Sequence, residues 1–404
     1  MREPGHLATL TPAEVRRAAN DLQARLTNHR QTLHANPELS NSEHRTAAYI
    51  EGVLDAMEVE HHRVLQTGIV ATIPGTDTQR GAIGLRADMD ALPITEADGR
   101  EGYRSRNEGV MHACGHDGHV AVQLGVAELL STLSRPARPV RLYFQPAEER
   151  EGGAKPMVQA GALDGADHAA ILALHCASHV PAGSIAYRHG AVTASVDEIA
   201  ITIHGAGGHA AHPETAIDPI PVAANLIMTA QQILTREIDP LQTAVLTFGS
   251  IHGGSRPNVI ADEVRLELTM RALEQTTREF LLKRINEVAE AVAHTHRATA
   301  TVEVNNGYPV GNNDPAPTTL LATAATEVLG AERVLVEPHP STGSEDFFHF
   351  GDTGVDVCMF RLGVGNAAEG ITAPLHSRHF DIDESALPVG VAVMVNAIRV
   401  SQSL

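Results

Sequence analysis

The chain has 404 residues, 43% of them hydrophobic and 20% charged, a composition that indicates a folded globular protein rather than a disordered one and predicts two domains. Its 49 acidic residues against 30 basic ones give a formal net charge of −19, so a phosphate backbone or an anionic membrane surface would be repelled. We therefore expect no nucleic acid and no membrane as partners.

Two further absences bear on where the protein works. No apolar run approaches the roughly 20 residues that span a bilayer, and residues 1–10 lack the pattern of a signal peptide. The chain has only 3 cysteines, an odd and sparse set that argues against a disulfide scaffold. We expect a cytoplasmic protein.

The first part of the chain alternates helices with short apolar strands. A helix is expected to begin at Thr11-Pro12, where Glu14 completes a capping box, and to end near Asn36-Pro37. Further helices are expected over 42–57 and 117–133, and strands over 69–73, 82–86, 140–144 and 169–174. This order predicts an α/β domain with a mainly parallel sheet and flanking helices.

From about Tyr187 the pattern changes. Strands are expected over 198–204, 242–250 and 263–271, and helices over 219–237 and 275–295. That order predicts a small α+β domain inserted into the first. The α/β pattern resumes with a helix over 315–329, a strand over 355–361 and a helix over 383–401. We therefore assign residues 1–187 and 303–404 to one domain and 188–302 to the insertion.

Four polar side chains come directly after predicted strands. Asp88 follows the strand over 82–86, Glu148 and Glu149 follow the strand over 140–144, and His175 follows the strand over 169–174. In mainly parallel sheets the ligand site lies beyond the carboxyl ends of the strands. These side chains are therefore expected to lie on one rim of the sheet.

The stretch 111–119, Met-His-Ala-Cys-Gly-His-Asp-Gly-His, concentrates possible metal ligands. Cys114 and His116 are separated by one glycine, a spacing that lets a turn aim both at one point. With Glu149, His175 and His376 they would supply five ligands, more than one tetrahedral metal needs and suited to two metals that share a water. A neighbouring carboxylate could then take a proton from that water.

Each of these residues also has an ordinary structural interpretation. A cysteine beside a helix start is more often a buried small hydrophobe, adjacent glutamates are most often solvated, and a histidine at a strand end can simply be hydrogen-bonded. A second functional interpretation makes Cys114 a nucleophile activated by His116. It gives the glutamates and the other histidines no role, so we favour the metal site.

Motifs of one known family extend from near residue 30 to near residue 385. They are HANPELS at 34–40, LRADMDALP at 85–93, MHACGHD at 111–117, QPAEE at 145–149, GGHAA at 207–211, PNVI at 257–260, GSEDF at 343–347 and LHS at 375–377. Together they resemble the metal-dependent amidohydrolase/aminoacylase family, which includes hippurate hydrolases, auxin-amino-acid conjugate hydrolases and N-acyl-amino-acid deacylases. This family is a branch of the dinuclear metallopeptidase superfamily.

The resemblance implies a metal site and an architecture. Two divalent ions per chain would be held by five ligands, namely Cys114, His116, Glu149, His175 and His376. The thiolate favours zinc, manganese is the other leading choice, and cobalt or nickel would also suit the donor set. The inserted domain would be a lid that also carries the dimer contact, so we expect a homodimer or a higher homo-oligomer.

The resemblance also implies catalytic and substrate-binding residues. Glu148 would be the general base and then the general acid, and Asp88 would lie close to the metals. His209 would reach the scissile carbonyl or the substrate carboxylate, within its own subunit or across a dimer. Asn258 and Arg271 would grip the free carboxylate of the amino acid.

The reaction expected from these roles is hydrolysis of an N-acyl amino acid, either hippurate-like or acetylated, to a carboxylic acid and a free amino acid. A metal-activated water would be the nucleophile. Within the enzymes, the alternatives are an N-acetyl-diaminopimelate deacetylase and a dipeptidase. In a different class, the alternative is a non-catalytic metal-containing binding protein.

Overall fold

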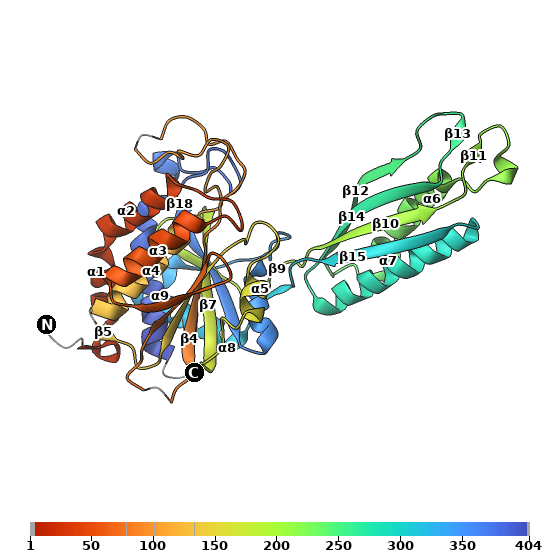
Figure 1. Ribbon diagram of the computed structural model, residues 1–404. Coiled ribbons are helices and arrows are strands. Elements are labelled where there is room, and N and C mark those ends of the chain that lie inside the picture. The colour runs from red at the N-terminus through yellow and green to blue at the C-terminus, as the bar shows by residue number, and fades with distance from the viewer. Residues whose placement is uncertain (1–4, 78, 101, 133, 402–404) are drawn as a thin grey trace. The chain divides into compact units, whose positions relative to one another are not determined.

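The structure, a computed structural model, describes residues 5–77, 79–100, 102–132 and 134–401. It divides into two compact units (Figure 1). The first holds the described residues of Met1–Gly190, Asn312–His339 and Asp346–Leu404, and the second holds Ala191–Gly311 and Pro340–Glu345. Strands β9 (Gly190–Thr193) and β16 (Gly311–Asn313) lie where the chain passes between them.

An eight-stranded sheet forms the centre of the first unit, in the order β17-β8-β18-β7-β4-β6-β3-β2. Strands β18, β7, β4 and β6 run parallel to one another, while β3 and β2 continue the sheet antiparallel, so the predicted mainly parallel sheet is confirmed. The strands are β2 (Glu60–Val64), β3 (Gly68–Ile73), β4 (Ala82–Asp88), β6 (Val140–Gln145), β7 (His168–Pro181), β8 (Ile185–Tyr187), β17 (Val334–Val336) and β18 (Val357–Gly365). All residues of β4 are buried, as its central position and its mainly apolar sequence favour, and its two charged residues, Arg86 and Asp88, pair with each other.

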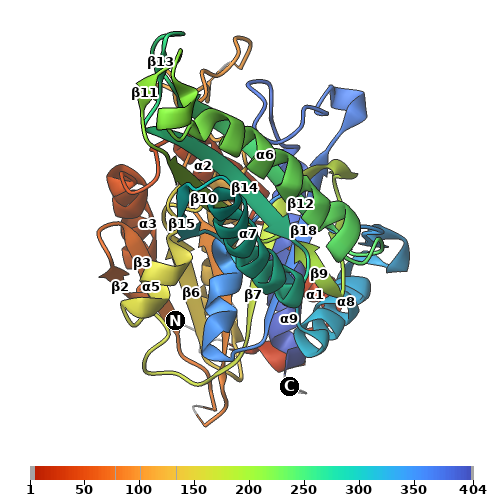
Figure 2. The ribbon, with the colours of Figure 1, turned by 90° about the vertical axis from the view of Figure 1, so that its right-hand side faces the viewer.

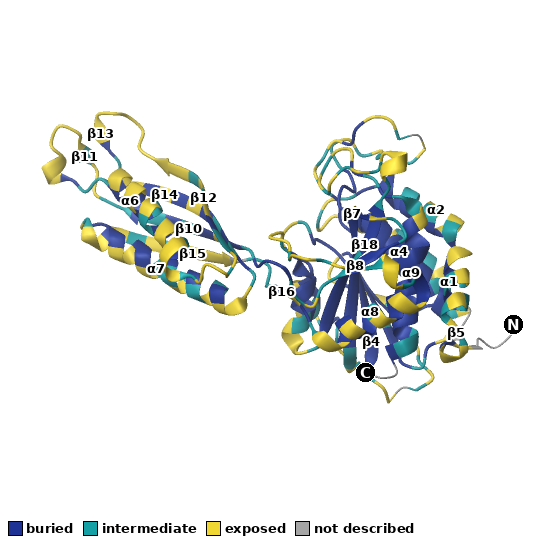
Figure 3. Ribbon diagram, turned by 180° about the vertical axis from the view of Figure 1, so that it is seen from behind, coloured by how far each residue is buried: buried dark blue, intermediate teal, exposed yellow. Residues whose placement is uncertain are grey.

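Helices cover this sheet, and several of them have an exposed outer side (Figure 3). They are α1 (Pro12–Asn20), α2 (Gln23–His34), α3 (His44–Ala56), α4 (His116–Thr132), α5 (Ala154–Gln159), α8 (Pro315–Leu329) and α9 (Leu387–Val400). The helix predicted over 117–133 corresponds to α4, and Leu133 lies outside the described residues. Gly125 of α4 lets α2 approach, because a Cβ there would lie 2.5 Å from a methyl carbon of Leu26.

The first helix departs from the prediction. The capping box at Thr11 is present, with the Glu14 amide donating to Thr11 Oγ1 at 3.3 Å. The single helix expected as far as Asn36 is however two helices, α1 and α2, separated at Asp21-Leu22. Asn20 and Asp21 have low helix propensity because their side chains compete for backbone hydrogen bonds, and this weak pair marks the break.

The second unit is a four-stranded antiparallel sheet in the order β12-β14-β10-β15, with α6 (Pro219–Gln232) and α7 (Gln275–Thr295) on one face (Figure 2). Its strands are β10 (Asp197–His204), β12 (Ala244–Gly253), β14 (Glu263–Ala272) and β15 (Thr299–Asn306), and a small pair, β11 (Gly208–His209) with β13 (Val259–Ile260), extends from them. Residues of β10 alternate in burial, with Ile199, Ile201 and Ile203 in the core beneath the helices. The boundary predicted after residue 302 is wrong, because it falls inside β15, which pairs with β10 along its whole length.

A buried ionic cluster ties α2 to the start of α4. Arg30 is 0% exposed; its Nε lies 2.9 Å from Asp117 Oδ2, its Nη2 lies 2.6 Å from Asp381 Oδ1 and its Nη1 lies 3.1 Å from Glu384 Oε1. Its guanidinium also lies over the Tyr103 ring, 4.8 Å from the ring centre. Asp117 follows His116 directly, so this cluster fixes the first turn of the helix that carries a predicted ligand.

We expect Arg30→Met to lower the free energy of unfolding by about 3–5 kcal/mol, because it leaves buried carboxylates without their counter-charge. Urea denaturation measures the loss. Arg63→Met is the matched control: Arg63 pairs with Glu51 at 2.6 Å on the surface, where such a pair contributes at most about 1 kcal/mol. Equal small losses in the two variants would contradict this account.

Among the described residues no helix is both long enough and apolar enough to cross a membrane.

Candidate metal centre

The stretch 111–119 turns sharply into α4 at Gly115. The φ angle of Gly115 is +88°, and a Cβ at this position would lie only 2.8 Å from the Cβ of Cys176. Glycine fits here because it adopts a positive φ without strain and has no Cβ to collide with Cys176. The turn places Cys114 just before the helix and His116 at its first residue, and both side chains are buried.

Cys114, His116 and His175 form the first group of possible ligands, with all ligand atoms within 4.8 Å of one another. Cys114 Sγ lies 3.6 Å from His175 Nε2. His116 Nδ1 donates to the Asp90 carbonyl at 2.9 Å and His175 Nδ1 donates to the Cys176 carbonyl at 2.8 Å, since a carbonyl can only accept. In both rings the Nδ1 hydrogen bond leaves Nε2 as the nitrogen that could bind a metal, which requires that Nε2 carry no proton when the ion binds.

Cys114 also belongs to a second group, with Glu149 and His376, again within 4.8 Å. His376 Nε2 lies 3.3 Å from Glu149 Oε1, and the same oxygen lies 3.8 Å from His116 Nε2. The thiol is thus common to both groups. The structure brings together all five side chains that the sequence nominated as ligands.

The charges in this cluster favour a bound cation. Burial and the nearby Glu149 and Glu148 carboxylates raise the pKa of the Cys114 thiol well above its usual value. Burial lowers the pKa of His116, but Asp88 and Asp90 outweigh it and raise the pKa to about 10. His116 Nε2 is buried without a hydrogen-bond partner among the described residues. This nitrogen lies among thiolate, imidazole and carboxylate donors, and that set of donors fits a pair of divalent ions.

Asp88 lies beside the cluster and is fully buried. Its Oδ2 pairs with Arg86 at 2.5 Å and lies 3.7 Å from His116 Nε2, while its Oδ1 accepts a hydrogen bond from His119 Nδ1 at 2.5 Å. Burial raises the pKa of Asp88, but Arg86 and His116 hold it well below its usual range. His119 Nε2 accepts the Cys176 amide at 2.8 Å, so both nitrogens of His119 are occupied and this ring supports the site rather than offering a ligand.

Sequence reasoning gave no role to Asp90, yet Asp90 fixes the turn that carries the two glutamates. Its Oδ1 accepts the Glu148 amide at 3.1 Å, and its Oδ2 accepts the Glu149 amide at 3.0 Å and the Ser40 hydroxyl at 2.7 Å. The turn needs such support because the preceding Ala147 has a φ of +55°. The sequence feature that could have indicated this role is the position of Asp90, two residues after Asp88 at the same strand end.

Removal of this support is expected to weaken metal binding. Asp90→Ala should lower metal affinity by about 10–100-fold, the usual cost of losing a group that orients ligands, as measured by competition with a chromophoric chelator. Asp90→Asn, which keeps one amide-accepting oxygen, should lose less. Unchanged affinity in Asp90→Ala would show that the turn holds its shape without this carboxylate.

His112 is the remaining imidazole of the stretch. It is buried, neither of its ring nitrogens has a hydrogen-bond partner among the described residues, and burial lowers its pKa to about 4. Among these residues it belongs to none of the ligand groups. It packs as a neutral ring beside His34, with ring centres 6.3 Å apart.

The predicted substrate-binding residues all lie in the second unit. His209, in β11, is exposed, and its Nδ1 accepts the Ala211 amide at 3.1 Å, so Nε2 carries the proton. Asn258 lies next to it, since its carbonyl accepts the Ala210 amide at 3.2 Å. Arg271 lies near the far end of β14, where Nη1 donates to the Thr342 carbonyl at 3.0 Å.

One chain does not bring Asn258 and Arg271 together. Strand β14 begins at Glu263, shortly after Asn258, and the eight steps from there to Arg271 span about 27 Å. In Figure 1 the β11–β13 pair and the opposite end of β14 are correspondingly far apart within the second unit. Because β14 separates them, Asn258 and Arg271 of the same chain do not lie at one carboxylate.

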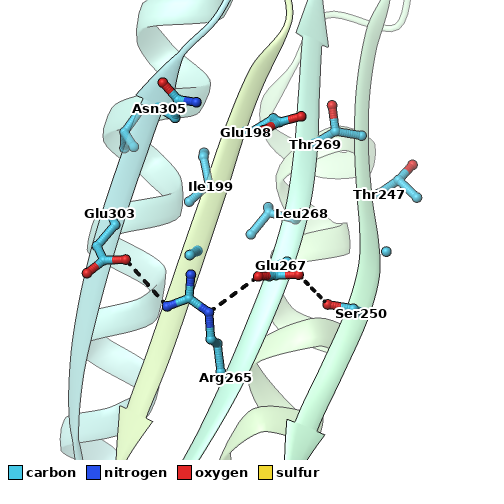
Figure 4. A pocket seen from close by; sticks show the side chains of 13 residues that line it. Glu198, Ile199, Thr247, Ser250, Arg265, Glu267, Leu268, Thr269, Glu303 and Asn305 are labelled. Carbon is cyan, nitrogen blue, oxygen red and sulfur yellow. Dashed lines mark hydrogen bonds and ion pairs between the residues drawn. The ribbon is translucent and has the colours of Figure 1, made fainter. Parts of the chain in front are cut away.

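The open face of the second unit's sheet has a hollow of about 530 Å³ (Figure 4). Arg265 lies across it, 3.3 Å from Glu267 and 3.4 Å from Glu303, and Ser250 donates to Glu267 at 2.9 Å. No cysteine or histidine lines this hollow among the described residues. Arg265, Glu267 and Glu303 are already paired with one another, so the metal-ligand cluster of the first unit is the better candidate for chemistry.

Comparisons with known proteins agree with this site. The model of peptidase family M20/M25/M40 matches residues 84–400. An N-acetyl-L-cysteine deacetylase of Bacillus subtilis is 40% identical over 331 residues, covering 81% of this chain and 78% of the relative. A thermostable carboxypeptidase of Saccharolobus solfataricus is 36% identical over 367 residues, covering 89% of this chain and 91% of the relative.

Solved structures give the same result. The YXEP protein of Bacillus subtilis, a dinuclear metal binding peptidase from the M20 family, has a TM-score of 0.82 and 31% sequence identity, covering 95% of this chain and 99% of that chain. The matches to hydrolases, together with the ligand cluster, identify an enzyme, a metal-dependent amidohydrolase with a peptidase-like fold. The chain belongs to peptidase family M20/M25/M40.

Proposed function

We propose that this enzyme hydrolyses the amide bond of N-acyl amino acids to a carboxylic acid and a free amino acid. The observation that carries the proposal is that four potential ligands lie around the Cys114 thiol, the fifth. Glu148 forms a third group with His116 and Glu149, within 4.8 Å. The similarity to a relative named as an N-acetyl-L-cysteine deacetylase supports an N-acyl amino acid as the substrate.

Two divalent ions would be held by Cys114, His116, Glu149, His175 and His376. When bound, such ions polarise a carbonyl and lower the pKa of a water molecule. The soft thiolate favours zinc, while the imidazole and carboxylate donors also admit manganese, cobalt or nickel. Cys114 belongs to both groups, so its thiolate would be a donor that the two groups share.

Glu148 would transfer the proton of the attacking water, with support from other residues of the chain. Glu148 is buried and its amide is held by Asp90, so its carboxylate is positioned beside the ligands. It takes a proton from the attacking water and delivers it to the nitrogen of the leaving amine. Asp88, ionised and paired with Arg86 and His119, keeps the rings of the cluster oriented.

Residues of the second unit would bind the substrate. His209 Nε2–H is a donor suited to the oxyanion, and Asn258 and Arg271 are suited to the free carboxylate. The length of β14 between Asn258 and Arg271 favours an arrangement in which two copies of the chain contribute to one site. We therefore propose a homodimer or a higher homo-oligomer.

A substrate panel tests the proposed function. Protein loaded with zinc or manganese is given N-acetyl amino acids, hippurate, N-acetyl-diaminopimelate and dipeptides. We expect kcat/KM for one of the simple N-acyl amino acids to exceed that for every dipeptide by about tenfold or more, a difference of about 1.4 kcal/mol in transition-state binding.

Other outcomes of the panel would support the rivals. A preference for dipeptides would favour a peptidase, in line with the relative named as a carboxypeptidase. A preference for N-acetyl-diaminopimelate would narrow the substrate to that compound. Metal-loaded protein that is inactive on the whole panel would favour a non-catalytic binding protein.

A further inference from the structure

Arg361 is a cation beside the ligand cluster that none of the roles above uses. It lies in β18, directly next to His175 of β7 in the parallel register. Neighbouring strands are about 4.8 Å apart, so the long arginine side chain starts within reach of whatever lies beside the His175 ring. The positive guanidinium acts on that ring, since after burial Arg361 is the largest cause that lowers the pKa of His175.

The register also shows which face of the sheet Arg361 occupies. Arg86 of β4 pairs with Ala173 of β7, and Ala173 pairs with Met359 of β18. Side chains two residues further along each strand point to the same face, and these are Asp88, His175 and Arg361. The alternate residues Leu174, Cys176, Phe360 and Leu362 belong to the core beneath the helices. Arg361 therefore shares the face of the sheet on which Asp88 and His175 lie.

The charge of Arg361 is not balanced by an ion pair within the described part of the chain. Among the described residues no carboxylate forms an ion pair with it, and its one recorded polar contact is Nη1 to the Met359 sulfur at 3.9 Å. Arg86 on the same face is different, because it pairs with Asp88 at 2.5 Å and with Asp346 at 2.9 Å. In a chain with a net charge of −19, a partly buried arginine without an anion is available to a negatively charged ligand.

We propose that Arg361 selects substrates whose acyl group ends in a second carboxylate, such as N-succinyl amino acids. This inference rests on the proposed function. There, residues of the second unit bind the carboxylate of the amino acid, so Arg361 of the first unit remains available to the acyl group of the substrate. The guanidinium forms a two-pronged, charge-assisted contact with that terminal carboxylate, beyond the carbonyl that reacts.

The test compares N-succinyl-alanine with N-butyryl-alanine, whose acyl chains have the same length and differ in the terminal charge. In the wild-type enzyme we expect kcat/KM for the succinyl substrate to be at least about tenfold higher, as one charge-assisted contact allows. In Arg361→Gln the ratio falls to about one, through loss on the succinyl substrate alone, and Arg361→Lys restores part of it. Arg63→Gln, on the edge strand β2, serves as the control that keeps the wild-type ratio.

Binding gives a readout independent of turnover. Calorimetry is expected to show that succinate binds the wild-type enzyme at least about tenfold more tightly than butyrate, and that Arg361→Gln removes the difference. The inference would be overturned if the ratio of kcat/KM for the two substrates were near one in the wild type, or were unchanged in Arg361→Gln. An equal loss of kcat/KM on both substrates would also overturn it, because that result indicates a structural role for Arg361. If neither acyl substrate is cleaved while dipeptides are, the proposed function has failed; if the butyryl substrate is cleaved without a preference, only the inference about Arg361 has failed.

Discussion

Glu148→Gln is expected to lower kcat by about two to four orders of magnitude while the protein keeps its metal. Glutamine has nearly the same size as glutamate, and the backbone N–H of residue 148 can still donate to Asp90, so the turn should keep its shape. Glutamine cannot accept a proton from water at neutral pH, and the leaving amine then lacks its proton donor. Steady-state kinetics on the best substrate of the panel, with metal content measured on the same sample, gives the result.

Glu151→Gln is the matched control for this variant. Glu151 lies in the same loop but is exposed, and its Oε2 accepts a hydrogen bond from Asn41 at 3.1 Å. Its loss should change kcat by about twofold at most, as surface substitutions usually do. A fully metal-loaded Glu148→Gln enzyme that works at the wild-type rate would remove Glu148 from the mechanism.

Cys114→Ser is expected to weaken metal retention by more than about 100-fold, beyond the cost of losing a group that only orients ligands. The reason is that Cys114 belongs to both ligand groups, so one substitution removes a donor from each. A serine hydroxyl is a poorer ligand because it stays protonated where a thiol can become a thiolate. Metal content after dialysis against a chelator measures the loss.

The stability of the apo-protein should change much less, which separates a ligand from a buried hydrophobe. Cys358→Ser is the matched control, since Cys358 is also fully buried but contacts Thr318 of α8 instead of the cluster. It should retain metal like the wild type even if it unfolds at lower urea concentration. Full metal occupancy in Cys114→Ser would contradict the assignment of Cys114 as a ligand.

The parts of the fold that the sequence predicts well are those where one local pattern decides the structure. Strand β4 begins with the apolar run 82–85, which suits the middle of a covered sheet. The capping box at Thr11 depends on side chains three residues apart. The ligand cluster was predictable for a related reason: β4 and β6 end at one rim of the parallel sheet, which places Asp88 and Glu149 there. His175 lies level with that rim, although β7 does not end at residue 174 as expected but continues to Pro181.

The parts that were missed depend on contacts between distant segments. Strand β15 pairs with β10, about a hundred residues earlier in the chain, and the sequence of β15 alone indicates neither that partner nor the domain boundary beyond it. The role of Asp90 depends on amides of a turn some 58 residues away. The separation of Asn258 from Arg271 follows from the direction of β14, which a list of motifs does not contain.

Titration of the metal-free protein with zinc or manganese is the most direct test of the central claim, that Cys114 and the four side chains around it hold two ions needed for hydrolysis of N-acyl amino acids. The account predicts no activity without metal and a rise that reaches its plateau at two ions bound per chain. Full activity of the metal-free protein, or a plateau before any ion is bound by the cluster, would contradict it.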